Sequence, residues 1–205
     1  MVDILPCKSL VNKPFLSAII LAGGKSSRMN YKDKGLLCVR NQQIIKFVID
    51  NLSKNCAEII LSANQNQQQY ATLGYPVYSD IDFINVGPLG GIYQCLHYVK
   101  YPYVIISPCD TPILPDHYVM RLLHALTQQQ AEIAVSEINQ QIQPAHLLIK
   151  TTLKTDIKNY LETGQRSLHG WLKRHKYTRV PFTNHKGEFL NLNSEKELLL
   201  FSKLN

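Results

Sequence analysis

A short apolar run that ends at two glycines constrains this chain more than any other feature. Residues 18–21 have the length and the apolar side chains of a buried strand, and Gly23 and Gly24 follow after one alanine. Glycines at this position can adopt a positive φ angle, which lets successive backbone N–H groups point at phosphate oxygens. Three cations follow within ten residues: Lys25, Arg28 and Lys34. The stretch therefore predicts a phosphate site at the end of a strand.

The known phosphate loops distinguish themselves by spacing. A Walker loop requires a glycine five residues before Gly24, and that position is Ile19; the dinucleotide fingerprint G-x-G-x-x-G also finds no match here. The pattern that fits is Leu-Ala-Gly-Gly-x-x-x-Arg-Met over residues 21–29, followed by Asp33-Lys34-x-Leu-Leu. This pattern closely resembles the signature loop of nucleotidyltransferases that act on sugar phosphates and cofactors.

Two later motifs extend the candidate site. Residues 87–91 (Gly-Pro-Leu-Gly-Gly) form a second glycine-rich turn before a helix, and such a helix start can hold an anion. Asp110 lies between two prolines at the end of an apolar run, residues 103–106. A carboxylate fixed in this way suits Mg²⁺, which binds one or two protein carboxylates together with substrate phosphates. A turn or helix cap is the alternative interpretation of Asp110.

Composition excludes several classes of protein. The chain has 205 residues, which favours one domain, and the net charge of +7 is spread along the sequence without a basic and aromatic run for nucleic acid. Five cysteines without a C-x-x-C pair indicate neither a disulfide framework nor a zinc site. No apolar stretch reaches the length of a membrane span and no signal peptide is recognisable. We expect a cytoplasmic protein without a nucleic acid or membrane partner.

Hydrophobic periodicity predicts an α/β fold. Strands and helices alternate to about residue 126, which indicates a mostly parallel central sheet with helices on both faces, a three-layer Rossmann-like arrangement. The later half contains strand candidates near residues 133–135, 146–149 and 179–182, with helices between and after them. We expect a single domain over residues 1–205, with a nucleotide half to about residue 126 and an acceptor half over residues 127–205.

The last helix carries a recognisable start. Ser194 and Glu197 have the spacing of a capping box, which places the helix start near Ser194 and leaves Asn191 and Asn193 in the loop before it. These two asparagines, together with His146 and Arg166, are the polar residues of the later half that could hold an acceptor. An ordinary polar surface is the alternative interpretation of each.

Taken together, the motifs resemble the molybdenum cofactor guanylyltransferase family. The resemblance runs from residue 17 to the C-terminus and rests on five motifs in one order: Leu-Ala-Gly-Gly at 21–24, Asp-Lys-Gly-Leu-Leu at 33–37, Gly-Pro-Leu-Gly-Gly at 87–91, Pro-Cys-Asp-Thr-Pro at 108–112 and Asn-Leu-Asn at 191–193. It implies a Rossmann-like fold, GTP and Mg²⁺, a molybdenum-bound molybdopterin acceptor, and transient contacts with molybdoenzymes or other proteins of cofactor biosynthesis.

The resemblance also implies roles for particular residues. The expected GTP-binding residues are Leu21, Ala22, Gly23, Lys34, Ser62, Asp80 and Asp110, and Asp110 is the expected metal ligand. Lys25, Arg28 and Lys34, with Asp110, are the expected catalytic residues. Arg166, Asn191 and Asn193 are expected to bind the acceptor. Asp80 is a candidate for either the guanine edge or the ribose. Ser62 stands where the family commonly has asparagine, with Asn64 two residues later, and Asn30 replaces a common glycine.

The residues imply a mechanism and leave two rivals. An acceptor phosphate oxygen attacks the α-phosphorus of GTP, and the cations neutralise charge without any general base. One rival is a related nucleotidyltransferase that uses CTP or a sugar phosphate. The other is a nucleotide-binding adaptor for molybdoenzymes that has no turnover.

Overall fold

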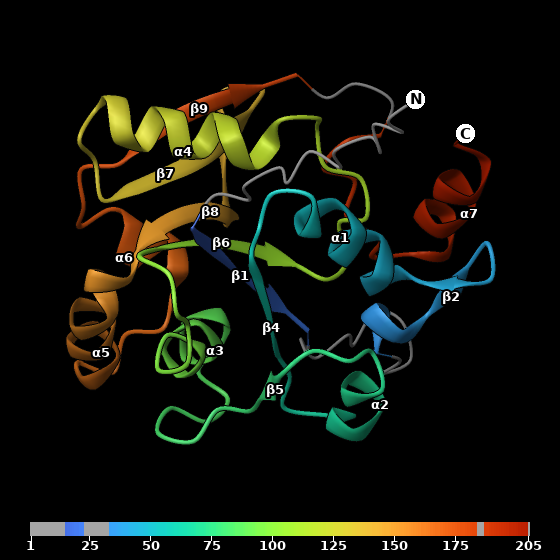
Figure 1. Cartoon of the computed structure of the whole chain (residues 1–205), viewed down its shortest axis with the longest axis horizontal. Coiled ribbons are helices and arrows are strands. Elements are labelled where there is room, and N and C mark those ends of the chain that lie inside the picture. Colours follow the sequence, from blue (N-terminus) through green and yellow to red (C-terminus); the bar gives the residue numbers. More distant parts are fainter. Residues whose placement is uncertain (1–14, 23–32, 184–186, 205) are drawn as a thin grey trace, which may run out of the picture.

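A seven-stranded sheet forms the centre of the molecule (Figure 1). The computed structural model describes residues 15–22, 33–183 and 187–204. Within these residues the strand order is β5-β4-β1-β6-β8-β7-β9. The strands are β1 (Leu16–Leu21), β4 (Glu58–Ser62), β5 (Val77–Tyr78), β6 (Tyr103–Pro108), β7 (Ile133–Ile138), β8 (Gln141–Lys150) and β9 (Thr178–Phe182). A separate two-stranded ribbon joins β2 (Cys38–Val39) to β3 (Gln42–Gln43).

Most neighbouring strands run parallel. β1 pairs in parallel with both β4 and β6, β4 with β5, and β7 with β9, whereas β8 is antiparallel to β6 and β7. The prediction of a mostly parallel α/β sheet is therefore confirmed. Because β1, β4, β5 and β6 point the same way, their carboxyl ends meet at one edge of the sheet, where ligands bind in open α/β folds.

Helices cover both faces of the sheet. They are α1 (Ile44–Ser53), α2 (Gln67–Ala71), α3 (Pro88–Cys95), α4 (Tyr118–Gln128), α5 (Lys154–Glu162), α6 (Leu168–Leu172) and α7 (Glu195–Lys203). Short 3-10 turns occupy Lys34–Leu36 and Thr151–Leu153. Figure 1 shows α1 and α4 on one face of the sheet and α3, α5 and α6 on the other. No helix within the described ranges is both long and apolar enough to cross a membrane.

Alternation along the strands builds two cores. In β1, Ala18 and Ile20 face the core shared with α1 and α4, whereas Ile19 faces the core shared with α3, α5 and α6. Successive side chains of a strand point to opposite faces, so an uninterrupted apolar run is what a doubly covered strand requires. A third, smaller cluster joins α7 to the start of α1 through Leu192, Phe201, Val39 and Ile44.

Three local features differ from the sequence prediction. The glutamine-rich residues 65–69, for which the hydrophobic pattern indicates no helix, begin a short helix, α2, because Tyr70 is fully buried and anchors an otherwise polar turn. Residues 88–91 are the first turn of α3 instead of a preceding turn, with Pro88 at its first position. Strand β8 begins at Gln141 and continues through Pro144; a register shift between Val135 and Glu137 of β7 accompanies its early part.

Candidate functional site

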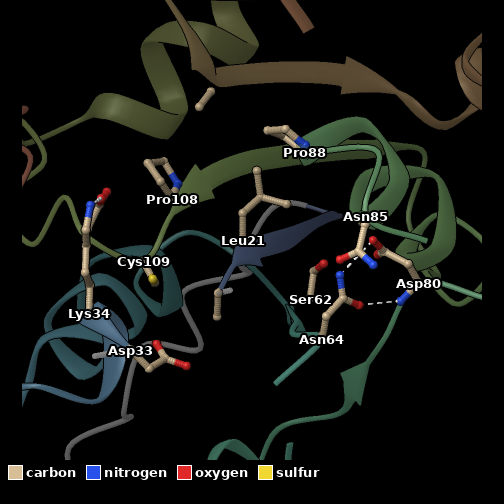
Figure 2. A pocket seen from close by; sticks show the side chains of 15 residues that line it. Leu21, Asp33, Lys34, Ser62, Asn64, Asp80, Asn85, Pro88, Pro108 and Cys109 are labelled. Carbon is tan, nitrogen blue, oxygen red and sulfur yellow. Dashed lines mark hydrogen bonds and ion pairs between the residues drawn. The ribbon is translucent and has the colours of Figure 1, made fainter. Parts of the chain in front are cut away.

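A cavity of about 430 Å³ opens at the carboxyl ends of β1, β4 and β6 (Figure 2). Its volume lies within the range of small-molecule sites, which is roughly 300–1,000 Å³. Six residues expected from the sequence line it: Leu21, Ala22, Lys34, Ser62, Asp80 and Asp110. They come from five separate stretches of chain. The fold therefore brings residues of separate sequence motifs into one cavity. The other lining residues are Asp33, Asn64, Asn85, Gly87, Pro88, Gly91, Pro108, Cys109 and Ala145.

Lys34 and Asp110 form an ion pair in the wall of the cavity. The Lys34 Nζ atom lies 3.2 Å from Asp110 Oδ2, and the two side chains are 19% and 18% exposed. Asp110 lies two residues after the end of β6, and Lys34 begins the 3-10 turn after the first phosphate motif. A partly buried ammonium group at the carboxyl end of the sheet provides positive charge for a phosphate, because partial burial weakens screening by solvent.

Asp33 fixes the turn that carries Lys34. Its Oδ1 atom accepts hydrogen bonds from the Gly35 N–H at 3.2 Å and from the Tyr70 hydroxyl, and its Oδ2 atom accepts one from Asn66 Nδ2 at 3.0 Å. A side chain at Gly35 would place its Cβ 2.6 Å from the Tyr70 hydroxyl oxygen. Burial, the neighbouring Cys109 and the bond to Asp33 raise the pKa of Tyr70, so its hydroxyl stays a donor.

Asp80 and Asn64 form the other end of the cavity. Asn64 Nδ2 donates to Asp80 Oδ2 at 2.8 Å, and the Asp80 backbone N–H donates to Asn64 Oδ1 at 2.8 Å. This reciprocal pair fixes both side chains, and Figure 2 shows them on the side of the cavity away from Lys34, close to Ser62 and Asn85. Asp80 Oδ1 is buried and has no hydrogen-bond partner among the described residues. Burial raises the pKa of Asp80, against the opposing effect of the Asn64 bond.

Two glycines of α3 make room for this end of the cavity. A Cβ atom on Gly91 would lie 2.2 Å from Ser62 Oγ and 3.5 Å from Asp80 Oδ1. A Cβ atom on Gly90 would lie 2.6 Å from the Phe83 carbonyl oxygen and 3.3 Å from Asp80 Oδ2. Since contacts below 3.0 Å cannot be tolerated without movement, α3 approaches Ser62 and Asp80 only because both positions lack side chains. Gly87, before the helix, has a φ angle of 88°, which also favours glycine.

Of the residues expected to bind the acceptor, Asn191 and Asn193 are hydrogen-bonded to other side chains, whereas Arg166 is exposed in a loop. Asn193 Oδ1 accepts a hydrogen bond from Lys34 Nζ, and Asn191 Oδ1 accepts one from Thr111 Oγ1 at 2.6 Å. Arg166 is exposed in the loop between α5 and α6, and its carbonyl oxygen would lie 3.9 Å from a Cβ atom on Gly87. This loop therefore approaches the cavity at Gly87, next to Pro88.

His146 lies in the core, so neither interpretation of it, an acceptor contact or an ordinary polar surface residue, fits the structure. Its side chain is only 3% exposed and packs against the rings of Phe189 and Tyr118, at centroid distances of 5.2 and 6.3 Å. The neighbouring Ala145 lines the cavity instead. Successive residues of a strand face opposite sides of the sheet, so Ala145 of β8 faces the cavity whereas His146 faces the core.

The fit of a divalent metal rests on Asp110. No group of three or more histidine, cysteine, aspartate or glutamate side chains gathers into a metal centre in the part of the chain that the structure describes. A single rigid carboxylate fits Mg²⁺ in the manner of sites where substrate phosphates and water complete the shell. Asp110 has the required donor chemistry, and Lys34 is the cation that now contacts it.

Residues 23–32 fall outside the described ranges, and they include Gly23, Gly24, Lys25, Arg28 and Asn30 of the first motif. Sequence reasoning missed Asn85 as a lining residue, and it noted Asn64 only as lying two residues after Ser62. For Asn64 the signal was its position after a strand end; for Asn85, within a loop, there was none. Cys109 lines the cavity while only 7% exposed, and burial raises the pKa of its thiol.

A mostly parallel sheet with a polar cavity at its carboxyl edge is the arrangement of ligand-binding α/β proteins. The sequence profile of the MobA-like NTP transferase domain matches residues 18–180. A molybdenum cofactor guanylyltransferase from Shewanella loihica is 37% identical over 184 residues, which cover 90% of this chain and 94% of the relative. The chain belongs to the molybdenum cofactor guanylyltransferase family.

Solved structures agree with the fold. Molybdopterin-guanine dinucleotide biosynthesis protein A from Archaeoglobus fulgidus aligns with a TM-score of 0.73 at 14% identity, over 89% of this chain and 95% of that one. The 4-diphosphocytidyl-2C-methyl-D-erythritol synthase from Anaerococcus prevotii aligns with a TM-score of 0.70 at 14% identity, over 92% and 94%. At these identities the structures establish the shared fold, and proteins with different nucleotide products share it.

Proposed function

We propose that this protein transfers GMP from GTP to the phosphate of molybdenum-bound molybdopterin, with pyrophosphate as the second product. One observation carries the proposal: a single cavity holds the Lys34–Asp110 pair on one side and the Asp80–Asn64 pair on the other, at the carboxyl edge of the sheet. Membership of the guanylyltransferase family supports GTP and molybdopterin as the substrates.

The two ends of the cavity suggest how GTP lies in it. The ammonium group of Lys34 attracts the phosphates, so the nucleoside would extend toward Asp80, across the backbone of Leu21 and Ala22. Guanine presents two adjacent N–H donors, and a carboxylate is a natural bidentate acceptor for them. Asp80 Oδ1, buried without a partner among the described residues, supports a donor from the ligand at this place. A ribose hydroxyl is the other donor that Asp80 would accept.

The proposed reaction exchanges one phosphoanhydride for another. A phosphate oxygen of the acceptor forms a bond to the α-phosphorus of GTP, and the bond from that phosphorus to the bridging oxygen of the β-phosphate breaks. The electron pair leaves with pyrophosphate. Since the attacking phosphate is already ionised near neutral pH, no side chain needs to remove a proton.

Charge neutralisation and alignment are then the main tasks of the protein. Lys34 would stabilise the charge on the α-phosphoryl oxygens, and Lys25 and Arg28 would stabilise the leaving pyrophosphate. Asp110 would hold Mg²⁺ together with phosphate oxygens, and the ion would supply neutralising charge when bound. In that state Lys34 is free to turn from Asp110 toward the nucleotide.

The acceptor would approach from the later half of the chain. We assign the nucleotide half to residues 1–126 and the acceptor half to residues 127–205 of one domain, with Arg166, Asn191 and Asn193 toward the acceptor. The approach of the Arg166 loop to Gly87 supports this direction. The proposal also places the protein in the cytoplasm, where it would meet GTP, and includes transient contacts with proteins that receive or supply the cofactor.

Replacement of Asp110 tests the proposed chemistry. With GTP labelled at the α-phosphate, Mg²⁺ and molybdenum-bound molybdopterin, we expect the wild-type protein to release pyrophosphate and to place the label in the dinucleotide product. Asp110→Ala should lower Mg²⁺-dependent transfer by at least about 100-fold, the order seen when a key electrostatic group is removed, with the melting temperature nearly unchanged. Asp116→Ala, at an exposed position after the same strand, is the matched control. Full transfer by Asp110→Ala would remove Asp110 from the mechanism.

A further inference from the structure

The Asn-Leu-Asn turn, residues 191–193, lies against the segment that carries Asp110. The Leu192 backbone N–H donates to the Asp110 carbonyl oxygen at 2.9 Å, and Thr111 Oγ1 donates to Asn191 Oδ1 at 2.6 Å. Thr111 is fully buried, so its bond to the turn is sheltered from water. These contacts join residues about 80 positions apart in sequence and fix the turn beside the candidate phosphate end of the cavity.

The last residue of the turn contacts the functional lysine itself. Lys34 Nζ donates to Asn193 Oδ1 and also lies 3.2 Å from Asp110 Oδ2. The ammonium group therefore has two oxygen partners, a neutral amide from the turn and a carboxylate from the end of β6. The three residues come from positions 34, 110 and 193, and only the tertiary fold brings them together.

Asn193 is itself held from both sides. Its backbone N–H donates to Glu197 Oε2 at 2.7 Å, and the same oxygen accepts a bond from Ser194 Oγ at 3.0 Å at the start of α7. Leu192, the preceding residue, is fully buried in the cluster with Val39 and Phe201. A backbone fixed at both neighbours limits the positions open to the Asn193 side chain, which is the condition for precise positioning of a partner.

A neutral partner has a specific advantage for Lys34. The lysine stem has four carbons and many rotamers, so an unsupported ammonium group would sample several positions. A carboxylate holds it strongly but cancels much of its charge, whereas an amide carbonyl orients it and leaves the charge available. Asp110 does the first and Asn193 the second.

We propose that Asn193 is a positioning residue that holds the Lys34 ammonium group over the cavity for the nucleotide phosphates. This inference rests on the proposed function, because it requires Lys34 to contact the phosphates of GTP. Asn193 acts through Lys34 in this role and needs no contact of its own with the nucleotide. The capped start of α7 thereby becomes part of the nucleotide site.

A double-mutant cycle on GTP binding tests this role without requiring turnover. Calorimetry would compare the wild-type protein, Asn193→Ala, Lys34→Met and the double variant, with Asn159→Ala on the exposed face of α5 as the matched control. We expect Asn193→Ala to weaken GTP binding about tenfold, as loss of a bond to a charged group does. In the Lys34→Met background the same change should have no further effect, and the control should bind GTP like the wild type.

The outcomes separate the inference from the proposed function. A wild-type protein that binds no GTP would overturn the proposed function and this inference with it. Two results with a wild-type protein that binds GTP would overturn the inference alone. One is a dissociation constant for Asn193→Ala equal to that of the wild type. The other is an equal loss of GTP affinity from this change in the wild-type and Lys34→Met backgrounds. If Asn193→Ala does not fold, Asn193→Asp keeps the acceptor oxygen but adds charge; we expect weaker GTP binding that again depends on Lys34, and unchanged binding would contradict the proposal.

Discussion

Asp80 has one oxygen bonded and one buried without a partner among the described residues. A buried acceptor without a donor costs stability, roughly 1–3 kcal/mol and more for a charged group. A protein tolerates this cost where a ligand supplies the missing donor, and this cost is consistent with the proposed place of Asp80 at the nucleoside end of the site. Its partner Asn64 lies two residues after Ser62, the position where the family commonly has asparagine, and it lines the same cavity.

Replacement of Asp80 distinguishes a guanine contact from a ribose contact. If Asp80 accepts from the guanine edge, wild-type protein should prefer GTP over inosine triphosphate, which lacks the 2-amino group, and Asp80→Asn should reduce this preference by about tenfold. If it accepts from the ribose, the variant should instead lose the preference for GTP over 2′-deoxy-GTP. Asp82→Asn, an exposed neighbour, serves as control. If Asp80→Asn leaves both nucleotide preferences unchanged, Asp80 has no role in nucleotide selectivity.

At the scale of elements, the first turn of α3 lacks side chains at two positions that face the candidate site. Gly90 and Gly91 let the helix pass within contact distance of Ser62 and Asp80, and the sequence motif marked the place as glycine-rich. The glycine-rich motif predicted a turn here, and glycine disfavours helix interiors by about 1 kcal/mol. The close approach overrides that propensity, and a close approach between distant segments has no local signal.

Gly91→Ala tests the close approach together with a compensating change. The new Cβ atom would lie 2.2 Å from Ser62 Oγ, so we expect a loss of about 1–3 kcal/mol in the free energy of unfolding, the usual cost of overpacking. Adding Ser62→Ala removes the clashing oxygen and leaves a Cβ contact of 3.3 Å, so the double variant should recover much of the loss. Chemical denaturation of the two single variants and the double variant measures this. A double variant no more stable than Gly91→Ala would show that the clash is elsewhere.

The elements differ in how far the sequence predicts them. The doubly covered strands β1, β4 and β6 were predictable because uninterrupted apolar runs can be buried on both faces, and α1, α4 and α7 because of their periodicity or cap. The helix α2 was missed because a single tyrosine anchors it. The lining residue Asn85 and the Lys34–Asn193 contact were also beyond prediction, because each depends on how loops fold onto the sheet.

At the scale of the whole molecule, the candidate site lies at one edge of the sheet, whereas a titratable group, His146, lies in the core. His146 lies between α4 and the sheet, among Tyr118, Phe182 and Phe189, and burial lowers its pKa to about 3. Its Nδ1 atom has no hydrogen-bond partner among the described residues. The folded protein therefore holds this imidazole neutral at a pH where the unfolded chain protonates it.

Acid should destabilise the protein through His146. The folded pKa lies below the unfolded value of 6.5, so the unfolded state binds the extra proton, and stability is lost as pH falls from about 6.5 toward 3. This group contributes a slope of about 1.4 kcal/mol per pH unit in that window. His146→Phe, an aromatic replacement in an aromatic cluster, should remove the slope, whereas His124→Gln on the exposed side of α4 should not. Denaturation at pH 7 and pH 5 compares the three proteins, and equal losses in all three would exclude His146.

The measurement that tests the central claim most directly is calorimetric binding of GTP, CTP and ATP to the wild-type protein, each with and without Mg²⁺. The proposed function, with the phosphates at Lys34 and the base at Asp80, predicts that GTP binds, that Mg²⁺ strengthens its binding, and that CTP and ATP bind at least about tenfold more weakly. A preference for CTP would contradict guanylyl transfer and indicate a cytidylyltransferase. Absence of binding by all three nucleotides would contradict the nucleotide site itself.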